Sequence, residues 1–132
     1  MIAVLAMLPV LLSGCMPTAG ESDSTGSQVY VKNGVVKGFV PMPLYPKAQP
    51  VESYNFNSNM GASFISGDSL AKVVNFYSKG LTQIGWEQNL YKQSDSSYIF
   101  QIKGVKYQGE VVVNTASDGK KTAISVFVFP RN

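Results

Sequence analysis

Few side chains in the sequence could perform acid–base or nucleophilic chemistry. The chain of 132 residues has no His and one Cys. It therefore lacks the most common general base near neutral pH and the residues for a dithiol or zinc–thiolate site. A glycosidase needs two facing carboxylates, and no local spacing suggests such a pair. The acidic residues are scattered: Glu21, Asp23, Glu52, Asp68, Glu87, Asp95, Glu110 and Asp118.

Other reactive arrangements are equally poorly represented. Ser66 and Ser69 have one basic neighbour, Lys72, which the helical periodicity places on the solvent face. The glycines of residues 61–67 are not followed by the Lys-Ser/Thr of a phosphate loop. The net charge is +3 with dispersed lysines, unlike a nucleic-acid-binding stripe. We expect no enzyme activity, no metal, no cofactor and no nucleic-acid partner.

Cys15 is the residue with the clearest chemical context. It follows an apolar run at residues 2–12, which is too short to span a bilayer and has the size of a signal-peptide core. The sequence LSGC at residues 12–15 resembles the lipobox of bacterial lipoproteins. The resemblance implies cleavage between Gly14 and Cys15, and diacylglycerol and N-acyl (palmitate) chains on Cys15. The alternative is a buried N-terminal helix with an incidental Cys.

The same resemblance implies a location and a partner. The protein would be a membrane-anchored lipoprotein of the bacterial cell envelope, working beside an unidentified envelope protein. Met16 stands where Asp would favour inner-membrane retention, so the outer membrane is favoured in a Gram-negative cell. No Lys or Arg precedes Lys32, so we expect the signal peptide at residues 1–14 to be incomplete at its N-terminus.

The elements that follow predict one small domain. Residues 15–27 comprise the lipidated Cys and a flexible tether with almost no large apolar side chain. Residues 28–132 form the single domain. Asn33-Gly34 between two β-prone runs predicts a short hairpin. The three prolines of residues 41–46 predict an extended segment on the surface.

One helix and several strands are readable from periodicity. Apolar residues from Leu70 to Ile84 recur at helical spacing, with Asp68 as the expected N-cap and Gly85 as the stop. Alternating residues from Thr122 to Phe129 and three shorter runs after Trp86 predict strands. Two strands are expected before the helix, around a turn at residues 58–61. The expected fold class is α+β, with the element order β-β-α-β-β-β-β. One amphipathic helix packs on an antiparallel sheet of about five to six strands, and a short hairpin can precede this sheet.

Three motifs resemble small bacterial envelope lipoproteins of unknown function. PLYPKA at residues 43–48 resembles their P-x-Y-P-G-A opening, with Lys47 where Gly is usual. DSLAKVVNFY at residues 68–77 resembles their D-S-x-x-x-V-x-x-F-Y helix, and residues 81–86 match L-x-x-x-G-W. The domain is also similar to the helix-grip domains of outer-membrane assembly lipoproteins, by analogy of fold alone.

Four aromatic residues are candidates for a binding surface because they cannot all fit beneath one helix: Tyr91, Tyr107, Phe127 and Phe129. Phe76, Tyr77 and Trp86 are better explained as packing residues. The favoured function is a non-catalytic binding or assembly-accessory module. The alternative is a carrier of a small apolar or glycan ligand between helix and sheet, and a hydrolase with a carboxylate pair is the weaker alternative.

Overall fold

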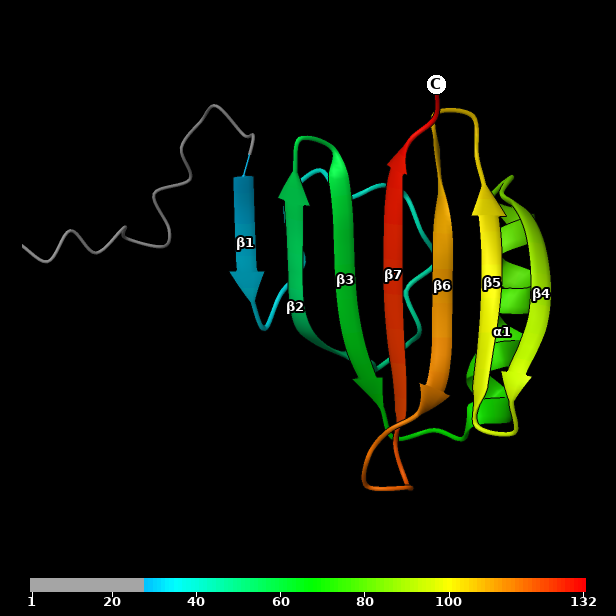
Figure 1. Cartoon of the computed structure of the whole chain (residues 1–132). Coiled ribbons are helices and arrows are strands. Elements are labelled where there is room, and N and C mark those ends of the chain that lie inside the picture. The colour runs from blue at the N-terminus through cyan, green and yellow to red at the C-terminus, as the bar shows by residue number, and fades with distance from the viewer. Residues whose placement is uncertain (1–27) are drawn as a thin grey trace, which may run out of the picture.

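A computed structural model describes residues 28–132 as one antiparallel sheet of seven strands with a single helix (Figure 1). The strands lie in the order β1-β2-β3-β7-β6-β5-β4, so the last strand of the chain is the middle of the sheet. The elements are β1 (Gln28–Lys32), β2 (Gln49–Phe56), β3 (Asn59–Ser66), α1 (Leu70–Gln83), β4 (Glu87–Ser94), β5 (Ser97–Lys103), β6 (Tyr107–Thr115) and β7 (Thr122–Pro130).

The expected α+β fold with five to six strands is wrong. The molecule is β-rich, and its single 14-residue helix accompanies seven strands. The additional strand is β1, which was expected in a local hairpin and instead pairs along its whole length with β2, placing Tyr30 opposite Tyr54. Pairing between segments some 24 residues apart leaves no local signal in the sequence, because hairpin patterns report only neighbouring strands.

The hairpin at Asn33-Gly34 does not form because residues 33–36 make hydrogen bonds with Val51 and Ser53 of β2 instead. The backbone N–H of Asn33 donates to the carbonyl oxygen of Val51 at 2.8 Å. The Ser53 hydroxyl, which is fully buried, donates to Gly34 O and accepts from the N–H of Val36, each at 2.8 Å. The Val36 side chain is thereby buried, and residues 33–48 turn away from the edge of the sheet.

The sheet has one covered and one uncovered face, which the alternation in β7 defines. Ile124, Val126 and Val128 face the core and are almost fully buried, whereas Phe127 and Phe129 point to the other side. Helix α1 covers the half of the sheet containing β4, β5 and β6 (Figure 1). Residues 33–48 cross the same face, where Val40 joins the core and Met42 packs against it. Helix α1 and the irregular segment at residues 33–48 therefore together cover the apolar face of the sheet.

Two local boundaries differ from those expected. The turn between β2 and β3 is Asn57-Ser58, not residues 58–61. Both residues have positive φ, 54° and 70°, as a two-residue hairpin requires. The helix N-cap is Ser69, whose hydroxyl accepts from the N–H of Lys72, rather than Asp68. The Asp68 carboxylate accepts a hydrogen bond from Tyr45 instead.

Helix length bears on membrane insertion. Among residues 28–132, no helix combines the length and the apolar character needed to cross a bilayer.

Tyr77 gives a direct test of the helix–sheet packing. Its side chain is fully buried, and within residues 28–132 its hydroxyl makes no hydrogen bond of ordinary geometry, although the backbone of Tyr45 lies close to it. Burial raises the pKa of this hydroxyl, which therefore stays neutral. Because an unpaired buried hydroxyl is destabilising, we expect Tyr77→Phe to increase the free energy of unfolding by about 1 kcal/mol in urea denaturation. A loss of stability would show that the hydroxyl has a partner.

Candidate functional site

An apolar cleft opens where the end of the helix meets the segment that completes the hydrophobic layer. Three chain segments line it: residues 40–43, residues 84–86 after the helix, and residues 104–107 between β5 and β6. Its volume is about 500 Å³ and its walls are mostly apolar. We call it the Trp86 cleft, after the largest side chain in its wall.

The end of the helix fixes the backbone of Trp86. Gly85 has φ +91°, its N–H donates to Thr82 O at 3.1 Å, and the N–H of Trp86 donates to Leu81 O at 3.0 Å. This pair of hydrogen bonds is the Schellman motif, which satisfies the last carbonyls of a helix and turns the chain sharply. Trp86 and Leu81 both belong to the hydrophobic core, so the turn is also fixed by packing.

The indole ring of Trp86 joins the other two walls of the cleft. Its Nε1–H donates to the carbonyl oxygen of Pro41 at 3.2 Å, although these residues are 45 positions apart. The six-membered ring lies over Gly104, where a Cβ would sit 3.1 Å from ring carbons. Trp86 is 9% exposed. The ring therefore forms a rigid wall rather than a freely moving surface side chain.

The rim of the cleft combines exposed apolar and cationic groups. Val105 is 90% exposed and Ile84 is 49% exposed. The loop that carries Val105 is held to the end of β7 by Arg131, whose guanidinium donates to Gly104 O at 2.6 Å and whose N–H donates to Lys106 O at 2.9 Å. Exposed apolar side chains beside an apolar cleft suit the entry of an apolar molecule.

The lining of the cleft has few groups that could perform acid–base chemistry. Lys106 and Tyr107 are its titratable side chains, and no carboxylate or hydroxyl of Ser or Thr lines it. Within residues 28–132 no group of three or more metal-ligating side chains comes together. The geometry of the Trp86 cleft suits binding of a ligand through shape complementarity and burial of apolar surface.

The candidate residues from the sequence lie in three separate places. Cys15 and Gly14 are outside the described residues. Tyr107 faces the core side, lines the Trp86 cleft and packs against the core. Phe127 and Phe129, each 44% exposed, and Tyr91, 42% exposed, lie on the uncovered face of the sheet. Residues 33–48 cover the opposite face, so the four aromatic residues do not form one patch.

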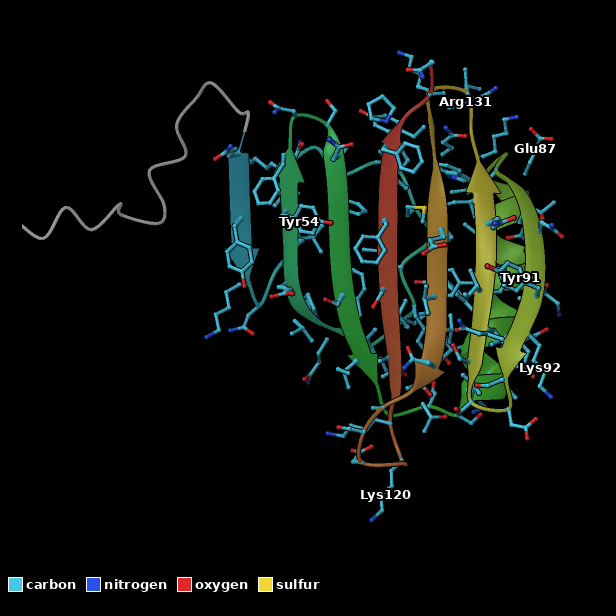
Figure 2. The ribbon with its side chains drawn as sticks, viewed as in Figure 1. Tyr54, Glu87, Tyr91, Lys92, Lys120 and Arg131 are labelled. Carbon is cyan, nitrogen blue, oxygen red and sulfur yellow. The ribbon has the colours of Figure 1, made fainter. Side chains whose placement is uncertain are left out.

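The lysines of the strand connections are also divided. Lys103 and Lys106 lie at the end of the sheet that carries Arg131, whereas Lys120 lies at the opposite end (Figure 2). Lys103 is the last residue of β5, and Lys106 and Lys120 lie in connections between strands, but the sequence does not show at which end of the sheet each of them lies. They form no single basic surface.

Sequence reasoning missed most of the cleft. Residues 41–46 were expected to wrap the surface, and in residues 104–107 only Tyr107 was a candidate, as part of an aromatic binding surface. The signal was present in Trp86 directly after a helix-ending Gly85, but the partners of the ring are far away in sequence. Only the tertiary fold brings Pro41 and Gly104 to it.

A family model described as START domain-like matches residues 47–121, which is more than half of the chain. The chain belongs to the START domain-like family. Such a family points to a ligand-binding module. The matched range contains Trp86 and the loop at residues 104–107, whereas residues 40–43 lie before it. No curated protein and no solved structure matches the chain.

Gly85 tests how the helix end positions Trp86. An L-residue with a side chain is strained at its φ of +91°, so we expect Gly85→Ala to lower the free energy of unfolding by about 1–2 kcal/mol. Gly67→Ala is the matched control, because a Cβ there has open space and its φ is not in the left-handed region. Equal stability of the two variants in urea denaturation would contradict the proposed geometry.

Proposed function

We propose that the protein binds a small apolar ligand reversibly in the Trp86 cleft, as a carrier and without catalysis. The observation that carries this proposal is an apolar cleft of about 500 Å³ in a START domain-like chain. That volume lies within the range of small-molecule sites, about 300–1,000 Å³. The rim cation Lys106 is the one charged side chain in the lining, so it can orient a ligand with a polar end.

The ligand would lie at the end of the helix–sheet layer and not inside it. The interior is filled by Tyr77, Phe100 and Leu81, each with no exposed surface. The cleft is open to solvent at Val105 and Ile84, both of which are exposed. A ligand in this position buries its apolar body against Trp86 and can leave without unfolding of the domain, as a carrier requires.

The single Trp of the chain provides the experiment. Trp86 is the one Trp in the sequence, so all tryptophan fluorescence reports on the wall of the cleft. We expect dibromostearate, whose bromine atoms quench tryptophan on contact, to quench the emission saturably with one site per chain. Unbrominated stearate should reverse the quenching by competition. Linear, non-saturating quenching would contradict a binding cleft.

A matched pair of variants separates the cleft from general surface binding. Ile84→Asn removes apolar surface from the rim, and the affinity for stearate should fall by about fivefold because roughly half of an Ile side chain is no longer available for burial. Val51→Asn is the control, since Val51 is similarly exposed, at 41%, and does not line the cleft. Equal affinities of the two variants would count against the proposed site.

We also propose that the protein is held at a bacterial envelope membrane by lipid on Cys15. The support is the lipobox-like LSGC sequence after the apolar run. More than one acyl chain is needed for stable anchoring, and a diacylglyceryl group meets that need. Cells expressing the protein should incorporate radiolabelled palmitate into it, whereas Cys15→Ala should incorporate none. Equal labelling of both would refute the anchor without affecting the ligand-binding proposal.

A further inference from the structure

A second depression lies on the outer face of α1 and is chemically unlike the Trp86 cleft. It has a volume of about 520 Å³ and shares no lining residue with the cleft. Three lysines line it, Lys47 from the turn before β2 and Lys72 and Lys79 from α1, with the rings of Tyr45 and Phe76 between them. We call it the lysine groove.

Lys47 occupies a backbone conformation that disfavours a side chain. Its φ is +64°, in the left-handed region that glycine adopts freely. The turn is held by the N–H of Ala48 donating to Tyr45 O at 3.1 Å. Strained residues that persist in a fold concentrate at functional sites. The positive φ therefore makes Lys47 a candidate for a functional role of its side chain.

Lys72 is also at a position where local physics disfavours it. Ser69 is the N-cap, so Lys72 is the third helical residue, where a capping box places Glu or Gln. A cation there faces the positive end of the helix dipole. The first turn of α1 contains no acidic residue to offset it. Two locally unfavourable lysines, from separate parts of the chain, thus converge on one groove.

The groove has an excess of positive charge. Within residues 28–132 the one ion pair joins Lys92 and Asp95, so no lysine of the groove is paired. Asp68 is the single carboxylate in the lining. It accepts a hydrogen bond of 2.5 Å from the Tyr45 hydroxyl, which raises the pKa of Tyr45 to about 12 and keeps that hydroxyl protonated. Three ammonium groups and one carboxylate leave a net charge of +2.

We propose that the lysine groove binds a phosphate group, with the rings of Phe76 and Tyr45 contacting the organic part of the ligand. A phosphate monoester carries about −1.5 to −2 charges at neutral pH, which matches the excess in the groove. Lysines bind phosphate as mobile point charges and need no fixed fork geometry. The phosphate can belong to a soluble ester or to a lipid headgroup, and these two sources share this chemistry.

The test uses three probes on the full chain, with binding followed by NMR shifts of the backbone amides of Lys47, Ala48 and residues 69–76. The probes are inorganic phosphate, glycerol 3-phosphate and soluble dihexanoyl phosphatidic acid, each at constant ionic strength. Binding of the phosphatidic acid about tenfold tighter than glycerol 3-phosphate identifies a lipid headgroup. Similar affinities for these two, both tighter than for inorganic phosphate, identify a soluble ester, whereas equal affinities for all three contradict the contact with the rings. Absence of saturable shifts with every probe overturns the proposal.

Two variants distinguish this site from an ordinary solvated helix face. Lys47→Gly removes the left-handed strain and Lys72→Glu restores a capping box, so both should raise Tm by a few degrees. Both should weaken phosphate binding by at least about fivefold. Lys121→Ala, an exposed lysine outside the groove, should leave binding unchanged. Variants that are more stable and bind phosphate as the wild type does would overturn the proposal.

Asp68→Asn is a variant for which we expect phosphate affinity to rise and not to fall. The variant removes the one negative charge of the groove while the amide oxygen can still accept from Tyr45. Phosphate affinity should rise by at least about threefold, and a fall would contradict the electrostatic argument. Binding of stearate to the Trp86 cleft should be unchanged in all these variants, so failure of one site is distinguishable from failure of the other.

Discussion

The structure depends on a mismatch between the width of the sheet and the width of its one helix. Seven strands span roughly 30 Å, whereas a helix of 14 residues covers about 10 Å by 21 Å. The uncovered part of the apolar face must be buried by something else. Residues 33–48 do this by inserting Val36 and Val40, and the buried Ser53 hydroxyl fixes their path. The hydrophobic layer is therefore assembled from a helix and an irregular, proline-rich segment.

Both candidate sites arise where this segment meets the helix. Residues 40–43 form one wall of the Trp86 cleft, and residues 45–47 form one wall of the lysine groove. Between them, Gly80 lies so close to Pro43 that a Cβ there would sit 3.3 Å from the proline Cβ. Helix and segment also touch where the ring of Tyr45 packs against that of Phe76, with the centroids 5.1 Å apart, and the two sites lie on either side of Gly80 and Pro43. Because residues 33–48 are irregular, they leave the Trp86 cleft and the lysine groove open beside α1, where a second helix would have packed.

The sequence predicts what local patterns encode. The alternation of residues 122–129 correctly predicts strand β7, and Gly85 correctly marks the helix end. The pairing of β1 with β2 and the contact of Trp86 with Pro41 are set by residues far apart in the chain. The Asn33-Gly34 hairpin signal was overridden because Val36 gains more by burial than by pairing at the edge of the sheet.

The Trp86 cleft was not predictable as a site because its residues come from three separate segments, and only Tyr107 among them was a candidate from the sequence. Prolines, glycines and a tryptophan become a site only through their placement. Lys47 is different: the resemblance to the P-x-Y-P-G-A motif predicted Gly at this position, and the positive φ gives a Lys there a physical cost. A residue that breaks a local rule is a better guide to function than one that merely fits it.

The central claim is that an apolar ligand binds at the Trp86 cleft and not on the uncovered aromatic face. Spin-labelled doxyl-stearate tests this directly, because its unpaired electron broadens the NMR signals of nearby amides. Selective broadening is expected at the amides of Val40, Met42, residues 84–86 and residues 104–107. Broadening centred instead on Phe127 and Phe129 would contradict it.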